Sequence, residues 1–384
     1  MDMKIVHLCL CGPVTDGWTY QDNLLSKYHR KAGHDVTLIA SQWIWGDDGK
    51  PAFFDKTDYV NEDGVRIIRL PIKKGTVHSK FKRYIGLYDA LEKNAPEVLF
   101  IHGCQFLDMP VVVKFLKKHS EVEVYLDNHA DFSNSATNWI SKNLLHKILW
   151  RSCAQKINPY VKRFYGVLPA RVDFLADVYG VPKEKIELLV MGADDESVQA
   201  AAAPEVRKGI RQQYGLNDDD FVIMTGGKID AFKTQTLLLM EAVQKIEDPK
   251  VRLVVFGSVT PELKDKVAAL ADGTKVQYIG WVQAKDSYDY FAAADLVVFP
   301  GRHSVFWEQV AAQGVPLLVK RWDGTMHTNV CGNTVFLEKD SAEEICQKLT
   351  ELLEPQRYAQ LKAAAKEASK GFLYSKIAEK SISD

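Results

Sequence analysis

The sequence predicts an α/β protein built from two doubly wound, Rossmann-like domains that face each other across a cleft. Three observations support this prediction. Short apolar segments bounded by Gly, Asn or Asp alternate along the chain with longer segments of helical period. The apolar segments are hydrophobic on both faces, which is typical of parallel strands in a covered sheet. The chain has 384 residues, more than one ordinary hydrophobic core accommodates.

The apolar segments define two series of predicted strands, and helical patterns connect them. In the first half the predicted strands are Met3–Leu10, Asp35–Ile39, Val65–Leu70, Glu97–Ile101, Val122–Leu126 and Phe164–Val167. Helical patterns between them cover Asn23–Lys31, Leu107–Lys118 and Ala170–Tyr179. In the second half the predicted strands are Phe221–Thr225, Arg252–Phe256, Val276–Ile279, Leu296–Phe299 and Pro316–Val319.

The domain boundary is predicted near residues 193–205. Met191–Asp194 ends a strand, and the alanine-rich segment Ala200–Ala203 leads into a charged helix. We therefore expect a first domain at 1–195, a second at 196–365, and a closing helical segment at 366–384.

Composition excludes several function classes. Lys and Arg number 49 and Asp and Glu number 50, so no global field recruits nucleic acid. The six cysteines show no CxxC spacing, which argues against a zinc site or a disulfide framework and fits a reducing compartment. The first segment lacks a secretory cleavage pattern and is too short to cross a bilayer. A cytoplasmic location is expected.

A glycine-lysine loop follows the first strand of the second domain. Gly226 and Gly227 stand at the carboxyl end of that strand, where backbone can approach a ligand closely. Lys228 and Lys233 place two cations beside it, which suits a diphosphate. The alternative interpretation is a glycine turn with two surface lysines.

A second loop leads from the strand ending at Phe299 into a helix. Ser304 is a predicted helix N-cap, and the free N–H groups behind it, including that of Val305, form an anion site. Glu308 lies in the first helical stretch and is predicted to accept hydrogen bonds from a ribose. The alternative for Glu308 is a solvated charge or a capping partner.

Two further loops were considered as sites. The loop Gly12–Trp18 contains neither GxGxxG nor a P-loop, although the backbone near Gly17 can approach a phosphate. The acidic run Asn217–Asp220 precedes a strand and predicts a solvated turn rather than a metal site.

The chain resembles the GT-B glycosyltransferases, specifically the retaining family numbered four, over almost its whole length. Asp16-Gly17 falls where that family has a Gly-Gly loop, and Lys228 and Lys233 keep the spacing of the Arg and Lys that hold the donor diphosphate. Other similar segments are Gly33–Val36, Ile186–Asp194, Ala292–Leu296 and Phe372–Lys380.

The resemblance departs from the family at one position that matters for chemistry. The family carries two glutamates separated by seven residues, and Glu308 matches the second, which holds the ribose. The first falls on Pro300, although Gly301 matches the glycine that follows it. Arg302 and His303 are the candidates to occupy the space of the missing carboxylate.

The resemblance implies a transfer of sugar from a UDP- or GDP-sugar, with retention and with neither metal nor cofactor. It implies that 1–195 is the acceptor-side domain, that 196–365 binds the donor, and that 366–384 crosses back to the first domain. Lys228, Lys233 and the N–H groups around Ser304 would stabilise the leaving diphosphate. His129, after a first-domain strand, matches the family's histidine near the donor sugar; His102 is the second choice.

The acceptor is predicted to be a glycan or a lipid-linked sugar. Two basic and aromatic stretches fit peripheral contact with the cytoplasmic face of the inner membrane. One contains Lys73, Lys74, Lys80, Lys82 and Arg83 with Phe81 and Tyr84; the other is Leu144–Tyr165. Solvated helix faces are the alternative.

Two rival functions stay open. One is a GT-B sugar-nucleotide 2-epimerase, against which the two lysines and Glu308 argue. The other is a nucleotide-sugar-binding subunit with little activity of its own, and Pro300 in place of the first glutamate keeps this alternative open.

Overall fold

The chain folds into two compact units, seen in a computed structural model that describes residues 2–46, 49–75 and 81–383. Unit 1 comprises Met1–Met191 with Tyr374–Asp384, and unit 2 comprises Gly192–Leu373. The first segment of unit 1 ends at Met191, four residues before residue 195, where the first domain was expected to end. Of the segment 366–384, only the part from Tyr374 onward belongs to unit 1.

Unit 1 is built on an eight-stranded sheet in the order β10-β9-β8-β7-β1-β2-β6-β5. Within it, only β5 runs antiparallel to its neighbour among the described pairings. The strands are β1 (Lys4–Cys9), β2 (Asp35–Ser41), β5 (Asp58–Val60), β6 (Arg66–Leu70), β7 (Val98–His102), β8 (Glu123–Asn128), β9 (Val161–Gly166) and β10 (Ile186–Leu188).

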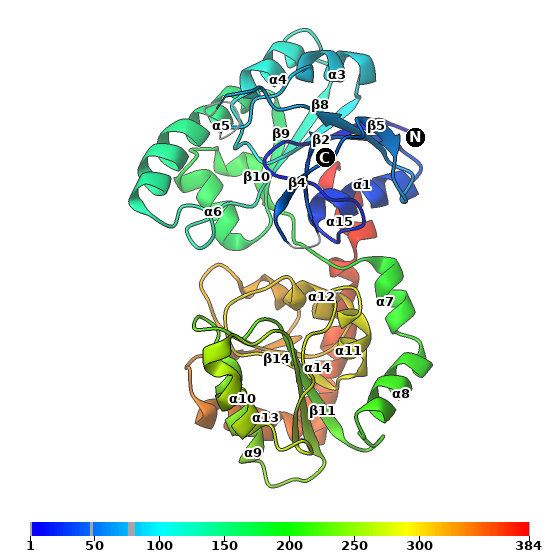
Figure 1. Ribbon diagram of the computed structural model, residues 1–384, viewed down its shortest axis with the longest axis vertical. Coiled ribbons are helices and arrows are strands. Elements are labelled where there is room, and N and C mark those ends of the chain that lie inside the picture. The colour runs from blue at the N-terminus through cyan, green and yellow to red at the C-terminus, as the bar shows by residue number, and fades with distance from the viewer. Residues whose placement is uncertain (1, 47–48, 76–80, 384) are drawn as a thin grey trace. The chain divides into compact units, whose positions relative to one another are not determined.

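Helices cover both faces of this sheet because alternate strand residues point to opposite sides. On one face Val6, Leu8 and Leu99 pack with residues of α3 (Leu87–Asn94), α4 (Met109–Leu116) and α5 (Arg151–Ile157). On the other face Ile5, Cys9 and Phe100 pack with α1 (Gln21–Lys31) and α15 (Tyr374–Ser381). The last helix of the chain, red in Figure 1, therefore lies against α1, which is blue. The remaining helix of this unit is α6 (Pro169–Asp177).

Several elements of unit 1 were absent from the predicted series. A two-stranded antiparallel ribbon joins β3 (Trp43–Trp45) to β4 (Pro51–Phe53). Strand β5 and the three-residue β10 are short edge strands, which carry little hydrophobic signal. The segment η1 (Ser141–Trp150) is a ten-residue π-helix, a rare form whose spacing of apolar residues differs from the helical period used for prediction.

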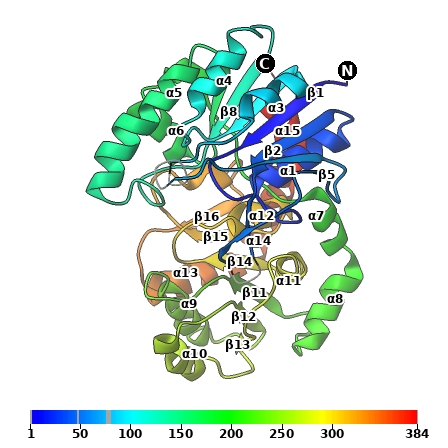
Figure 2. The same ribbon diagram turned by 45° about the horizontal axis from the view of Figure 1, so that its top comes forward.

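Unit 2 is built on a six-stranded, all-parallel sheet in the order β13-β12-β11-β14-β15-β16, which Figure 2 shows in sequence. The strands are β11 (Phe221–Gly226), β12 (Val251–Phe256), β13 (Val276–Tyr278), β14 (Leu296–Phe299), β15 (Leu317–Lys320) and β16 (Thr334–Leu337). The chain order reverses between β11 and β14. Ligands of doubly wound sheets bind outside the carboxyl ends of strands at such a switch point.

Helices also cover both faces of the second sheet, as Figure 2 shows. One face carries α9 (Gln235–Gln244), α10 (Lys264–Leu270) and α13 (Ala342–Leu353), whose apolar residues pack on Ile223, Leu253 and Val298. The other face carries α8 (Pro204–Gln213) and α11 (Ser287–Ala293). The remaining helices are α7 (Asp195–Ala201), α12 (Phe306–Ala312) and α14 (Pro355–Ala368).

The acidic run before β11 forms a turn. The Asn217 N–H donates to the Asp220 carboxylate at 2.7 Å, and Asp219 pairs with Lys250 at 2.7 Å. None of the helices in the described part of the chain combines the length and apolar character needed to traverse a membrane.

Candidate functional site

The glycine pair at the end of β11 is required by the packing of the neighbouring strand. A Cβ at Gly226 would overlap the Phe256 ring, and a Cβ at Gly257 would overlap the backbone of Gly227. Gly227 has φ +128°, a conformation that side-chain-bearing residues rarely adopt, with open space where its Cβ would be. The loop therefore leaves β11 without a side chain over its backbone, as a close approach to a ligand requires.

The two loop lysines lie in different surroundings. The Lys228 side chain is 59% exposed, and its ammonium is 3.5 Å from the Asp230 carboxylate. Lys233 is half-buried, and its ammonium has no ion-pair partner within the described ranges 2–46, 49–75 and 81–383. Both cations thus follow β11 at the switch point. This placement is compatible with binding a diphosphate and equally with the alternative of surface lysines.

Glu308 is a fully buried carboxylate on α12, the helix that follows β14. Its side chain is 0% exposed, which excludes the alternative of a solvated charge. The Nε2 atoms of His303 and His327 lie 2.8 and 2.6 Å from Glu308 Oε1. The other carboxylate oxygen, Oε2, has no hydrogen-bond partner among the described residues.

Electrostatics keep this carboxyl group ionised. Burial on its own would raise the pKa of Glu308, but His303 and His327 more than offset this and hold its pKa well below the usual value. A buried, ionised oxygen without a partner is costly unless a donor reaches it. Glu308 Oε2 is therefore prepared to accept a hydrogen bond from a ligand hydroxyl.

The helix that follows β14, α12, begins one residue later than the sequence predicted. The helix begins at Phe306 with Val305 as its N-cap, and no side chain caps it, so the prediction of Ser304 as N-cap is wrong. Ser304 instead accepts a backbone hydrogen bond from Trp307 through its carbonyl. Arg302 is exposed, whereas His303 turns toward Glu308.

Asp16 and Gly17 in unit 1 are held by the surrounding fold. The Tyr59 hydroxyl donates to Asp16 at 2.5 Å, and the Arg69 guanidinium lies 3.4 Å from the same carboxylate. Gly17 has φ +74°, and a Cβ there would lie 3.0 Å from the Glu62 carboxylate. Asp16 thus anchors its loop to β5 and β6, which is a structural role.

A hollow of about 300 Å³ lies close to this loop, where β1, β2 and β6 end. Its apolar lining includes Pro13, Trp43 and Tyr84, and Lys82 contributes a cation. The Lys82 ammonium also donates to the Cys11 carbonyl. The carboxyl ends of parallel strands meet at this edge of the sheet, so the hollow is a candidate ligand site of unit 1.

His129 follows β8 in unit 1 and contacts a buried carboxylate. Its Nε2 lies 3.2 Å from Asp127 Oδ2, as a close charge contact rather than a well-aligned hydrogen bond. The Asp127 side chain is 0% exposed, and His102 Nδ1 lies 3.0 Å from the same oxygen. Burial on its own would raise the pKa of Asp127, but His129 and His102 hold it well below the usual value.

The sequence analysis did not predict that His102 contacts His7 and, through it, His29. His102 Nε2 lies 2.9 Å from His7 Nδ1, and His7 Nε2 lies 2.9 Å from His29 Nδ1. All three histidines are buried. A signal was available, because a histidine inside the apolar strand Met3–Leu10 needs a buried partner, but which partner depends on strand order.

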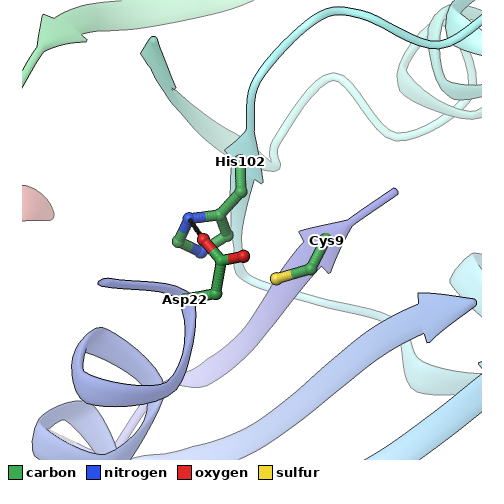
Figure 3. A group of neighbouring side chains, drawn as sticks. All are labelled: Cys9, Asp22 and His102. Atoms are coloured by element: carbon green, nitrogen blue, oxygen red, sulfur yellow. Dashed lines mark ion pairs between the residues drawn. The ribbon is translucent and has the colours of Figure 1, made fainter. Parts of the chain in front are cut away.

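In the described part of the chain, three groups of side chains bring metal-ligating atoms within 4.8 Å of one another. One is Cys9, Asp22 and His102, which Figure 3 shows turned toward a common point. Asp22 already lies 3.1 Å from His102 Nδ1, and burial raises the pKa of the Cys9 thiol to about 12, so the thiol stays protonated. The other groups surround Asp127 and Glu308, whose ion pairs are described above. Because these atoms already pair with one another, no metal role is assigned.

Comparison with known proteins finds one family and several curated proteins that resemble part of the chain. Residues 206–370 match the family described as "Glycosyl transferases group 1". Mannosylfructose-phosphate synthase of Agrobacterium fabrum is 24% identical over 216 residues, which cover 53% of this chain and 45% of that protein. D-inositol 3-phosphate glycosyltransferase 1 of Catenulispora acidiphila is 26% identical over 225 residues, 54% of this chain and 53% of that protein. The chain thus spans about half the length of these curated relatives.

Solved structures match over nearly the whole chain. Alr3699/HepE of Anabaena in complex with UDP has a TM-score of 0.67 and 16% identity, covering 98% of both chains. The catalytic domain of starch synthase IV from Arabidopsis thaliana, bound to ADP and acarbose, has a TM-score of 0.66 and 14% identity, covering 100% of both.

The two doubly wound sheets therefore define a protein of the GT-B fold. Within this class, residues 206–370 of the second unit are similar to the glycosyl transferases group 1 family, and the predicted resemblance to this group is confirmed.

Proposed function

We propose that the protein is a glycosyltransferase that moves a sugar from a UDP- or GDP-sugar to a glycan or lipid-linked acceptor, with retention and without a metal ion or cofactor. One observation carries this proposal. At the switch point of the second sheet, the glycine-lysine loop after β11 stands beside the loop that leads to Glu308, a buried carboxylate with an unpartnered oxygen. That combination suits a nucleoside diphosphate, with ribose on the carboxylate and phosphates near the cations.

In the proposed reaction the bond between the anomeric carbon and the donor phosphate oxygen breaks, and a bond to an acceptor oxygen forms on the same face of the sugar. The acceptor proton passes to the departing phosphate. Negative charge grows on the diphosphate, so Lys228 and Lys233 stabilise the transition state more than the ground state. Gly226 and Gly227 let the backbone approach the phosphates, and these lysines supply the positive charge that a metal ion would otherwise bring.

We further propose that His129 contacts the donor sugar. The Asp127 carboxylate lies at its Nε2, so Nδ1 is the ring nitrogen that remains for a ligand. The side chain is 38% exposed, so a ligand can reach it. His303 takes a different role from the one expected for the missing glutamate, because it supports Glu308.

A peripheral contact with an anionic membrane face is the proposed route to a lipid-linked acceptor. The π-helix η1 and the residue preceding it expose Ile140, Leu144 and Ile148, each at least 46% exposed, and Trp139 before them is 68% exposed. Lys147 is exposed on the same helix. Large apolar side chains beside cations are typical of a surface that rests on lipid headgroups.

The other basic stretch contributes less to this surface. The Lys82 ammonium is held by the Cys11 carbonyl, and Arg83 pairs with Asp108 at 2.9 Å. Tyr84 is buried, and Lys80 lies outside the described residues.

The test is donor turnover by the purified chain with a panel of UDP-, GDP- and ADP-sugars, followed by NMR of the product anomer. Glu308→Gln is expected to weaken nucleotide binding about 10- to 100-fold, because hydrogen bonds to charged acceptors contribute about 1.5–3 kcal/mol. Lys228→Ala or Lys233→Ala is expected to lower turnover about 100- to 1,000-fold. Glu367→Gln and Lys266→Ala, on exposed helix faces, are the matched controls.

Each rival function gives a different outcome. Ligand-induced stabilisation without turnover would support a binding subunit, and conversion of the donor sugar without an acceptor would support an epimerase. For the membrane contact, Ile148→Ser is expected to reduce flotation with anionic liposomes, while Val330→Ser, an exposed residue of unit 2, is not. Equal flotation of the unaltered protein with anionic and neutral liposomes would contradict that contact.

A further inference from the structure

Three buried histidines join a pair of carboxylates to the last helix of the chain in one continuous series of contacts. Asp127 Oδ2 lies 3.0 Å from His102 Nδ1, and His102 Nε2 lies 2.9 Å from His7 Nδ1. His7 Nε2 lies 2.9 Å from His29 Nδ1, and His29 Nε2 lies 2.9 Å from the Ala378 carbonyl oxygen on α15. The histidines come from β7, β1 and α1, so the series crosses the covered face of the sheet under α1 and α15.

Both ends of this series are acceptors, so its four hydrogen bonds need four N–H groups on three rings, and one ring must be doubly protonated. A carbonyl oxygen only accepts, so His29 Nε2 must carry a proton. A neutral His29 then has a lone pair on Nδ1, which accepts from His7 Nε2–H. A neutral His7 in turn has a lone pair on Nδ1, which must accept from His102 Nε2–H. The ionised Asp127 carboxylate also only accepts, so His102 Nδ1 must carry a proton as well.

We propose that His102 is a doubly protonated imidazolium, because the series needs one charged ring and His102 is the ring that faces the carboxylates of Asp127 and Asp22. Through the charge of His102, this series positions Asp127 and His129. The proposal assigns His7, His29 and His102 as positioning residues of the unit 1 site.

The surroundings of His102 match a buried positive charge. Asp22 of α1 lies 3.1 Å from its Nδ1 (Figure 3), so with Asp127 two carboxylates face one imidazolium. Its other neighbours are the protonated Cys9 thiol and His7 on β1, Phe100 on β7, and His129 in the loop after β8, which reaches the same Asp127 oxygen. The Gln21 amide also donates to that Asp127 oxygen at 3.2 Å.

The electrostatic balance supports this assignment. Burial on its own would lower the pKa of His102, but Cys9, Asp127 and Asp22 raise it well above the ordinary value. Burial lowers the pKa of His7 strongly, and it lowers the pKa of His29 to about 4, so both stay neutral near pH 7. One charged and two neutral histidines are what the hydrogen-bond directions require.

A fully neutral series would need every proton to shift by one position. His29 Nε2 would then carry a lone pair facing the Ala378 carbonyl oxygen at 2.9 Å, which is repulsive. The Ser381 hydroxyl, 3.1 Å from His29 Nε2, is the donor able to relieve this, but it already donates to Ala378 at 2.8 Å. The neutral arrangement therefore breaks one hydrogen bond and also removes the charge that faces two carboxylates.

The test is nitrogen NMR of the full chain labelled at its histidine rings, with assignments from single-histidine variants. Between pH 6 and pH 8, both ring nitrogens of His102 are expected to be protonated, and His7 and His29 to carry one proton each, on Nε2. His7→Phe removes the acceptor for His102 Nε2–H, so His102 is expected to become neutral. His7→Gln offers an amide oxygen as acceptor and is expected to restore the doubly protonated state.

His34 is the matched control, because it lies outside the series and its Nδ1 accepts from the Met3 N–H. His34→Asn should leave the His102 signals unchanged. A singly protonated His102 in the unaltered protein would overturn the proposal. One equivalent of bound zinc with a metal-shifted His102 signal would overturn it too, in favour of a metal site at Cys9, Asp22 and His102.

The role of the series in positioning His129 rests on the proposed function and has a separate readout. If the chain is a transferase, His7→Phe is expected to lower kcat about 10-fold and to shift the pH profile of kcat, with little change in the donor KM. His7→Gln should recover most of both. Absence of any turnover would contradict the proposed function alone and leave the NMR result standing, whereas unchanged kcat in His7→Phe would contradict only the positioning role.

Discussion

Both units hold one fully buried carboxylate between two histidines, and in both one carboxylate oxygen has no partner among the described residues. In unit 1 the carboxylate is Asp127, at the end of β8. In unit 2 it is Glu308, on the helix that follows β14. The two sites differ in the partners of the ring nitrogens that do not face the carboxylate. His102 continues into the His7–His29 series, whereas the remaining buried nitrogen of His327, Nδ1, has no partner among the described residues.

This difference shows how the protonation state of a buried histidine is set. Each of the two histidines beside Glu308 makes one hydrogen bond to the carboxylate, so the hydrogen bonds of this site do not require a doubly protonated ring. His102 must donate in two directions and is charged as a result. Similar local geometry thus requires a doubly protonated ring in unit 1 and does not require one in unit 2.

The largest expected contrast is in stability. Asp127→Asn leaves a buried imidazolium with one fewer counter-charge and is expected to cost about 3–5 kcal/mol of unfolding free energy. Glu308→Gln leaves two donors that need not be charged and is expected to cost about 1–2 kcal/mol. Hydrogen exchange with mass spectrometry, read separately for the two units, measures both losses. Equal losses would remove the distinction between the sites.

The second contrast is in pH dependence. His29 has a folded-state pKa of about 4, below its ordinary value of 6.5, so the unfolded chain binds more protons between those values. Its stabilising contribution is present above pH 6.5 and is lost as pH falls toward 4, about 3 kcal/mol in total. The unfolding free energies of the unaltered chain and of His29→Leu are to be measured from pH 4 to 7. The unaltered chain is expected to lose about 3 kcal/mol more than His29→Leu as the pH falls over this range.

His102 contributes with the opposite sign. Its folded-state pKa is raised, so its contribution is full below pH 6.5 and is lost as pH rises through the folded value. Unit 1 is therefore expected to lose stability on both sides of neutrality. A stability in unit 1 that did not depend on pH would contradict the assignment of charges in the series.

The smallest expected effect is at His327. His327→Asn removes one of the two donors to Glu308 Oε1 while His303 remains, so a loss of about 1 kcal/mol is expected. Nucleotide affinity, measured by calorimetry, should fall only a few-fold. A loss as large as that of Glu308→Gln would show that His327 holds the ligand itself.

The sequence predicted most of the central strands because they are buried on both faces and read as continuous apolar runs. It missed β3, β4, β5, β10, β16 and η1, since short edge elements and a π-helix follow neither period used for prediction. Glu308 was recognised from its position after a strand and a glycine loop. The histidine series was not, because His7, His29 and His102 are joined only by the tertiary order of β1, β7 and α1.

The return of α15 to the first sheet has a consequence for synthesis of the chain. Tyr374, Ile377 and Ala378 belong to the same core as Ile5 and Leu25, and they follow all of unit 2 in the sequence. Domains usually complete in order from the N-terminus. Here the helix covering that face of unit 1 arrives only after all of unit 2 has been made. Until then His29 has no acceptor on α15, so nascent unit 1 is expected to keep this face incompletely covered.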